Sequence, residues 1–184
     1  MNSITQKIAS SGVFQIELVK KIGGNDHDIL IKISKVLEEK FGPETVLTPS
    51  TIELYFNRDG SVPFIARLRG KIIGYIIGVP LETLDTEPWA RMDVNFGKKN
   101  TLYTYAFVIN RKYKSNGYAK MLKRVYLNWA RKRNHLKYIT GHVLEGISSN
   151  FKGKVYVVDK VPNWHGTKKV FEYYRRTLEL DRPM

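Results

Sequence analysis

The sequence predicts a mixed α/β (α+β) domain with a mostly antiparallel central sheet flanked by helices on both faces. Two observations support this fold class. Several runs alternate apolar and polar residues, as half-buried strands do, and others repeat apolar residues at helical spacing. With 42% hydrophobic and 26% charged residues, the 184-residue chain is expected to form a single domain over residues 1–184. This composition excludes a disordered chain, and no apolar run approaches the ~18 residues of a membrane-spanning helix.

The first predicted elements are a strand and a helix. Residues 14–19 alternate between apolar and polar side chains, which indicates a half-buried strand that ends at Gly23-Gly24. Apolar residues then recur at helical spacing over 29–37, behind the capping candidates Asn25, Asp26 and Asp28. The sequence Phe41-Gly42-Pro43 ends this helix.

A second, short helix and a hairpin follow. Thr48-Pro49 and the overlapping run 50–53 are two helix-start signals, which predict a helix through Phe56. The β-rich runs 63–68 and 71–79 are separated by Arg69-Gly70, which favours a tight hairpin. Residues 81–100 lack a clear period, so a long loop is expected there. The remaining predicted elements are strands at 102–109, 137–144, 154–161 and 170–178, and a helix at about 118–134.

The positive charge is concentrated in one part of the chain. Lys and Arg number 31 against 17 Asp and Glu, and twelve of the basic residues lie between Asp93 and Glu145, where no acidic residue occurs. This pattern predicts an anionic partner, and nucleic acid bound by the 98–137 segment is one candidate. The alternative is a solvated, basic helix face.

The Cys and His counts, and the start of the chain, narrow the kinds of site and location that we expect. The chain has no Cys, which excludes disulfides and thiolate nucleophiles. Its start has no apolar segment of the signal-peptide kind, so we expect a cytoplasmic protein that does not bind membranes. The four His residues show no metal-ligand spacing, so no metal site is predicted.

The junction between the strand 102–109 and the helix that opens at Gly117 is suited to bind a pyrophosphate. Backbone N–H groups of a first helical turn converge on an anion, and the helix dipole adds a favourable potential. Gly117 and Ala119 are small enough for close approach, while Lys114 and Lys120 add positive charge.

The run Lys114-Ser115-Asn116-Gly117-Tyr118-Ala119 resembles the R/Q-x-x-G-x-G/A signature of the GNAT (Gcn5-related N-acetyltransferase) superfamily, with Lys at the first position. The order of strands and helices is also similar. The resemblance implies direct transfer of an acetyl group from acetyl-CoA, bound in a V-shaped opening between two central strands, to a primary amine in a ternary complex. The cofactor-binding residues that it implies are Phe107, Val108 and Ile109 for the pantetheine and Lys114, Ser115, Asn116, Gly117, Tyr118, Ala119 and Lys120 for the pyrophosphate.

The sequence offers fewer candidates for catalytic residues than for cofactor-binding residues. Since the strand 102–109 carries no carboxylate, His142 and Glu145 are the polar candidates for a general base. Their odd separation points them to opposite faces of an unbulged strand, so one alone could face a cleft. Tyr156 is the nearest match to the family's general acid, although its surroundings indicate a strand. His142 could equally be a satisfied histidine in the sheet, and Glu145 a surface charge.

Two alternative functions stay open. One is a basic module that binds nucleic acid or the ribosome, and the other is a GNAT-like protein that binds acyl-CoA without turnover. The aromatic run 171–176 indicates a strand, with a base-stacking platform as the alternative. The acceptor amine is unknown, although Trp89, Trp164 and Glu82 are candidates for the walls of its site. A homodimer is also left open.

Overall fold

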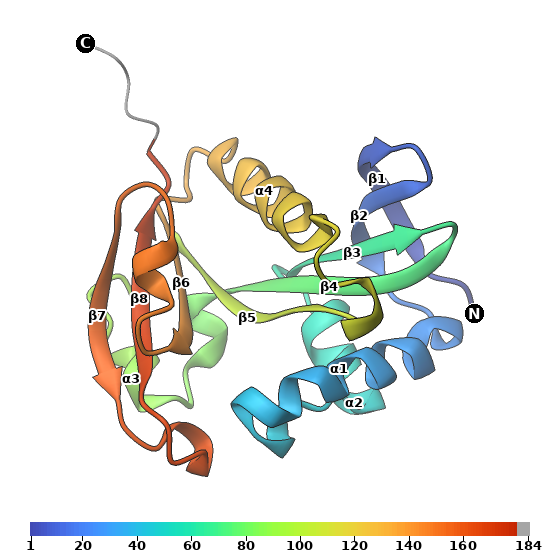
Figure 1. Ribbon diagram of the computed structural model, residues 1–184. Helices are drawn as coiled ribbons and strands as arrows, with labels where there is room; N and C mark the ends of the chain where they lie inside the picture. The colour runs from blue at the N-terminus through green and yellow to red at the C-terminus, as the bar shows by residue number, and fades with distance from the viewer. Residues whose placement is uncertain (180–184) are drawn as a thin grey trace. The chain divides into compact units, whose positions relative to one another are not determined.

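The computed structural model describes residues 1–179 and shows a mixed α/β fold. Over these residues eight mostly antiparallel strands follow the order β1-β2-β3-β4-β5-β6-β8-β7 (Figure 1). The chain divides into two compact units, and β5 and α4 each contribute to both. The first unit comprises Met1–Gly78 and Tyr105–Tyr126, and the second comprises Val79–Thr104 and the chain from Leu127 onward. The single domain expected over 1–184 stays a prediction.

The predicted strands and the three predicted helices are confirmed to within a few residues at their ends. One strand was not predicted, because Ile4–Ser11 has few apolar residues and is largely exposed along the edge of the sheet. The strands are β1 (Ile4–Ser11), β2 (Phe14–Lys21), β3 (Val62–Leu68), β4 (Lys71–Pro80), β5 (Thr101–Ile109), β6 (Tyr138–Leu144), β7 (Val155–Val161) and β8 (Phe171–Thr177). The helices are α1 (His27–Phe41), α2 (Pro49–Phe56), α3 (Pro88–Arg91) and α4 (Tyr118–Arg131).

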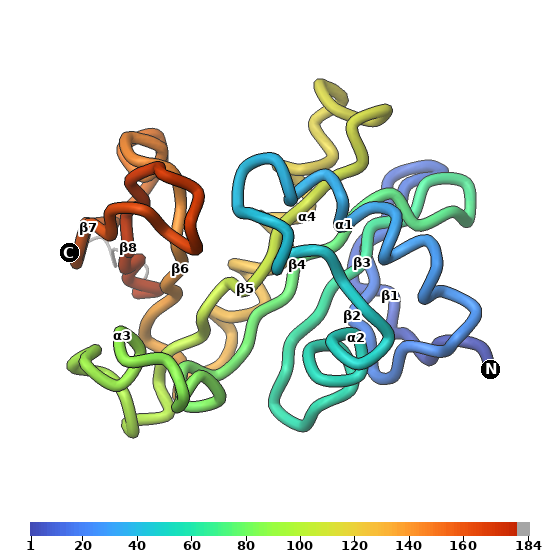
Figure 2. Tube along the Cα trace, turned by 90° about the horizontal axis from the view of Figure 1, so that it is seen from below, coloured from blue at the N-terminus to red at the C-terminus, as the bar shows by residue number. Residues whose placement is uncertain are grey.

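In the first unit, β1 to β4 form an antiparallel meander. The β3–β4 turn has positive φ at both Arg69 and Gly70, the conformation that two-residue hairpins favour. The second half of β5 lies beside β4, and the Asn110 N–H donates to the carbonyl of Ile73 at 2.8 Å. Helices α1 and α2 lie on one face of these strands and the first turns of α4 on the other (Figures 1 and 2).

Of the two start signals for α2, the structure uses the earlier one. The hydroxyl of Thr48 accepts from the Thr51 N–H at 3.2 Å, and the hydroxyl of Thr51 accepts from the Thr48 N–H at 2.8 Å. This reciprocal pair is a capping box with Thr at its third helical position. Glu53 instead accepts from the side chain of Asn57 at the other end of the helix.

In the second unit, β5 and β6 pair in parallel over three rungs, from Thr101 with Tyr138 to Tyr103 with Thr140. β6 continues to Leu144 as an antiparallel partner of β8, which pairs in turn with β7. All side chains from Phe171 to Arg176 are buried. The predicted strand is therefore confirmed, and its rings are not exposed for stacking on bases.

The 81–100 segment, expected as a loop, folds into a 3-10 turn, the short helix α3 and a series of turns. Glu82 closes this segment on itself, because its carboxylate accepts from the N–H groups of Gly97 and Lys99 at 3.0 and 2.8 Å. The segment therefore has a defined conformation, and it carries Trp89 on α3.

We predict that Gly74→Ala destabilises the first unit. A Cβ at Gly74 would lie 2.5 Å from the carbonyl oxygen of Val108, so β4 and β5 would have to separate. Overpacking of this kind costs about 1–3 kcal/mol of unfolding free energy, which urea denaturation measures. Gly24→Ala is the matched control, since nothing lies within 4 Å of its Cβ position. Equal stability of the two variants would show that the strands are not this close.

Candidate active site

The loop between β5 and α4 is held by its own hydrogen bonds. The side chain of Asn110 accepts from the Lys112 N–H at 3.1 Å, and the side-chain amide of Asn116 donates to the carbonyls of Tyr113 and Lys114 at 3.2 and 3.0 Å. Ser115 and Gly117 both have positive φ, at 65° and 77°. Two left-handed residues close together bring the chain from the strand directly into the helix.

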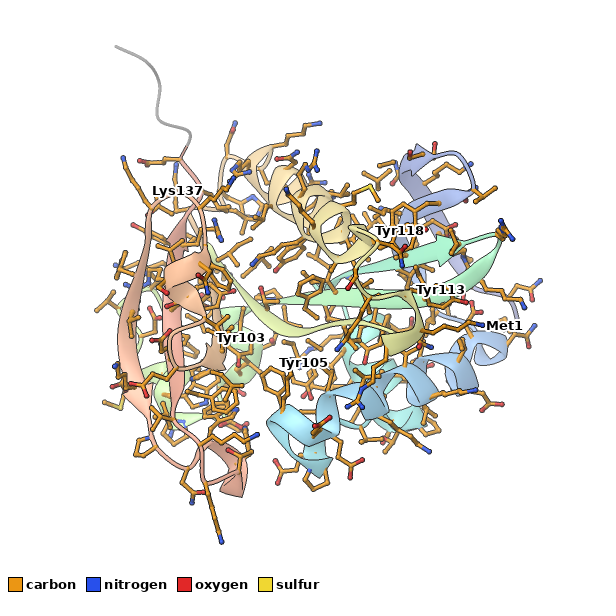
Figure 3. All side chains as sticks on the ribbon, viewed as in Figure 1. Met1, Tyr103, Tyr105, Tyr113, Tyr118 and Lys137 are labelled. Atoms are coloured by element: carbon orange, nitrogen blue, oxygen red, sulfur yellow. The ribbon has the colours of Figure 1, made fainter. Side chains whose placement is uncertain are left out.

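Helix α4 begins immediately after Gly117, whose carbonyl accepts from the N–H of Met121 at 3.1 Å. The N–H groups of Tyr118, Ala119 and Lys120 therefore have no acceptor within the helix. A Cβ at Gly117 would meet nothing within 4 Å, so this corner is open. Figure 3 shows Tyr113 in the loop and Tyr118 at the start of the helix.

The start of α4 is anchored on the strands of the first unit. The ring of Tyr118 stacks on Phe14 of β2, with centroids 4.6 Å apart. Leu122 and Tyr126, one and two turns later, are buried. Tyr126 packs so closely on β4 that a Cβ at Gly78 would lie 2.5 Å from its hydroxyl. The open N–H groups therefore have a fixed position.

This corner fits a diphosphate. Lys112, Lys114 and Lys120 are exposed around it. The helix dipole and the open N–H groups favour an anion at the same point. The structure thus brings the predicted residues 114–120 together at the end of the strand that carries Phe107, Val108 and Ile109. Their role in binding a cofactor stays a prediction, and acetyl-CoA is a ligand whose diphosphate matches this chemistry.

The second unit contains His142, on β6. Its Nδ1 lies 2.8 Å from the hydroxyl of Tyr103, a residue of β5 that Figure 3 labels. The imidazole is stacked between Trp164, at 3.8 Å between centroids, and Tyr173, at 4.9 Å. Burial, and to a smaller extent the nearby His165, lower its pKa to about 3, so the ring is neutral at physiological pH.

The two nitrogens of His142 differ in their surroundings. Nδ1 has the phenol of Tyr103, whereas Nε2 is buried without a hydrogen-bond partner among the described residues. The interpretation of a satisfied histidine therefore holds for one nitrogen alone. A buried, unpaired polar atom is uncommon and calls for an explanation.

Glu145 and Tyr156 lie elsewhere in this unit. Glu145 follows the end of β6, is exposed, and accepts from Lys160 at 2.6 Å. His142 is buried within β6, whereas Glu145 lies beyond its end, so their expected opposition on one strand stays a prediction. Tyr156 lies on β7, in a strand as its surroundings indicated, and its hydroxyl accepts from Arg175 at 3.1 Å.

Three residues that sequence reasoning missed complete this cluster: Tyr103, Tyr173 and Asp93. The carboxylate of Asp93 accepts from the Tyr173 hydroxyl at 2.6 Å and from Arg175 at 2.7 Å. Burial raises the pKa of Asp93, but hydrogen bonds from Arg175, Tyr173 and the Asn95 N–H outweigh it and hold the pKa below its usual range. No sequence signal pairs Asp93 with residues about eighty positions later.

Trp89 and Trp164, both predicted as wall residues, meet at His142. The Trp89 ring lies edge-on to the imidazole at 4.7 Å and 6.2 Å from the ring of Trp164. It also lies 4.9 Å from Tyr103, while its indole N–H donates to Glu87. Aromatic rings from the 81–100 segment, β5, β8 and the β7–β8 loop thus surround one neutral imidazole.

Two further findings concern residues 1–179. Within them, no three His, Asp or Glu side chains gather closely enough to hold a metal ion. No helix in this part of the chain is long and apolar enough to cross a membrane.

The sequence profile of the acetyltransferase (GNAT) family matches residues 31–146. No curated protein sequence matches the chain significantly. Among solved structures, NAA60 of Arabidopsis thaliana in complex with a bisubstrate analogue is 12% identical, with a TM-score of 0.65, and the match covers 90% of this chain and 99% of that one.

Two other solved structures are similar. The ribosomal-protein-S18-alanine N-acetyltransferase of Escherichia coli is 8% identical, with a TM-score of 0.63 and coverage of 92% of this chain and 96% of its own. An aminoglycoside 6′-N-acetyltransferase complexed with coenzyme A is 13% identical, also with a TM-score of 0.63, and the match covers 92% and 99% of the two chains. At these identities the likeness shows a shared fold.

We predict that Asp93→Asn lowers the unfolding free energy by about 3 kcal/mol at pH 7, because it leaves Arg175 buried without its counter-charge. The folded-state pKa of Asp93 is depressed, so its contribution is present above the unfolded pKa of about 4 and is lost as pH falls through the lower folded value. Chemical denaturation should therefore show a smaller difference between variant and wild type at pH 3.

Asp85→Asn, at an exposed position of the same segment, is the control. A difference that does not change with pH would contradict this account.

Proposed function

The chain belongs to the acetyltransferase (GNAT) family, and we propose that it is an acyl-CoA-dependent N-acyltransferase that passes an acetyl group from acetyl-CoA directly to a primary amine. The observation that carries this proposal is the open, basic corner at the start of α4. There, unpaired helical N–H groups, a glycine with space around it and exposed lysines meet at one point.

Each part of this corner has a defined task in the proposal. The N–H groups of Tyr118, Ala119 and Lys120 donate to the diphosphate, and the side chains of Lys114 and Lys120 neutralise its charge. The backbone of Phe107, Val108 and Ile109 pairs with the pantetheine arm. Acetyl-CoA supplies the activated acyl group as a thioester.

An amine attacks a thioester in its neutral form, so the enzyme needs a proton acceptor. We assign this role to Nε2 of His142, because the ring is neutral and this nitrogen has no protein partner among the described residues. Glu145 and Tyr156 are less suited to proton transfer, since both are exposed and already bonded to Lys160 and Arg175, respectively. Tyr156 as the acid that protonates the departing thiolate stays a prediction.

The two alternatives make different predictions. A GNAT-like protein without turnover would bind acetyl-CoA and yield no product with a broad panel of amines. Nucleic-acid binding by the 98–137 segment would weaken steeply with salt, with a log–log slope set by the number of phosphates neutralised. The burial of the 171–176 rings removes the stacking platform from that second alternative. A cytoplasmic location and a homodimer stay predictions.

We predict that Gly117→Glu abolishes saturable binding of acetyl-CoA in isothermal titration calorimetry. The new carboxylate would enter the space at the diphosphate corner and repel the ligand, and the positive φ adds backbone strain. Gly12→Glu is a matched control, because Gly12 also has positive φ and nothing within 4 Å, but lies in the β1–β2 turn.

The control variant should bind acetyl-CoA like the wild type. Unchanged binding by Gly117→Glu would remove the main support for the proposed function. Loss of binding in both variants would show that added negative charge, and not its position, weakens binding.

A further inference from the structure

The unpaired nitrogen of His142 is covered by aromatic rings. Trp164 stacks on one face of the imidazole at 19° between ring planes, Tyr173 lies on the other face at 26°, and Trp89 stands edge-on at 80°. Nε2 has almost no exposed surface in this arrangement. A substrate amine could reach this nitrogen only if one of the rings moved.

Of these rings, Trp164 is the one carried by a loop, since Tyr173 is in β8 and Trp89 is in α3. The loop between β7 and β8 places three non-glycine residues, Asn163, His165 and Lys168, in the left-handed region. Such conformations are strained and cluster at switch and ligand-binding segments.

Hydrogen bonds within the loop hold it together as one piece. The Trp164 N–H donates to the carbonyl of Lys169 at 3.3 Å, and the Lys168 N–H donates to the side chain of Asn163 at 2.9 Å. The hydroxyl of Thr167 donates to the carbonyl of Trp164 at 2.7 Å. These bonds lie within the loop, whose end is joined to the chain after β6 by the bond from the Glu145 N–H to the carbonyl of Val170 at 3.1 Å. The stack of the indole on His142 is a contact between side chains, so the indole could leave the imidazole without breaking these backbone bonds.

We propose that Trp164 is a gate over His142, and that the β7–β8 loop swings it away to admit a primary ammonium group carried on a ring-bearing, apolar stem. This proposal adds an acceptor class to the proposed function, and the acceptor class depends on that function. The gate itself can be tested without acetyl-CoA.

The rings around His142 indicate this class of acceptor. Trp89, Tyr103 and Tyr173 present ring surfaces, which attract an ammonium group and an apolar stem alike. The carboxylates nearest to these rings are already engaged, Glu87 with Trp89 and Asp93 with Tyr173 and Arg175. The charge of Asp93 is compensated by Arg175, so this carboxylate does not favour a polyamine.

Opening the gate would also change the basicity of His142. Burial depresses its pKa, so admitting water should raise the pKa toward that of an ordinary histidine. The titratable groups that face the ring are Tyr103 on β5, Tyr173 on β8 and His165 on the loop, with the Asp93–Arg175 pair behind Tyr173. The closed gate thus holds a weak base, and the open gate exposes a stronger one.

The test of the gate uses the full chain without acetyl-CoA. Trp164→Ala and Trp164→Phe are compared with the wild type by NMR titration of the His142 ring and by diethyl pyrocarbonate labelling, with peptide mapping to separate the four histidines. Trp129→Ala is the matched control, since it removes an indole of α4 that packs against the guanidinium of Arg133, away from His142 in the sequence. Circular dichroism verifies that each variant is folded.

We expect Trp164→Ala to raise the pKa of His142 by at least one unit and to speed its labelling at least tenfold, with Trp164→Phe near the wild type and Trp129→Ala unchanged. Unchanged titration and labelling in folded Trp164→Ala would overturn the gate. So would wild-type labelling of His142 as fast as that of exposed His135.

The acceptor class is tested with two amines as NMR probes of the wild type. 2-Phenylethylamine should shift the signals of His142 and of the Trp164 indole, whereas spermidine should not. Equal shifts with both amines, or none with 2-phenylethylamine, would overturn the acceptor class. Since neither the gate nor the probe experiment involves acetyl-CoA, a failure of the proposed function would appear separately, as absent acetyl-CoA binding.

Discussion

The position of three backbone N–H groups, in the first turn of α4, is the constraint on which the proposed function depends. An anion gains from such groups when they are held in place before it binds, because it then does not have to order them. Burial of Leu122 and Tyr126 and the stack of Tyr118 on Phe14 fix the helix on the strands. Gly117 leaves the space in front of them open. Apolar packing on the buried face of α4 thus holds the N–H groups of its first turn in place.

In the first unit the polar N–H groups are open to solvent, whereas in the second unit the polar groups of the site are buried. Asp93 is buried with Arg175 and Tyr173, and this network ties the 81–100 segment to β8. The segment in turn carries Trp89 to the ring of His142. A buried ion pair is costly unless its geometry is good, and here two hydrogen-bond donors and a backbone N–H satisfy the carboxylate. The result is an imidazole whose neutral form is favoured by its surroundings.

Local patterns predicted most of the fold. Alternation marked β2, β-rich runs marked the strands of the β3–β4 hairpin, helical spacing marked α1 and α4, and turn chemistry marked Arg69-Gly70. The residues of the proposed diphosphate site could be named for the same reason, since 114–120 are contiguous in the sequence. β1 lacks apolar residues, and its pairing depends on β2. The cluster around His142 joins residues from positions 89 to 173, and only tertiary structure brings these together.

The central claim is that N–H groups of the first turn of α4 bind the diphosphate of acetyl-CoA. Amide ¹H–¹⁵N spectra recorded during titration with coenzyme A test it most directly, because a hydrogen bond to phosphate moves an amide proton strongly downfield. The account predicts the largest downfield shifts at Tyr118, Ala119 and Lys120, saturating together. Saturable binding whose largest shifts lie outside residues 114–120 would contradict it.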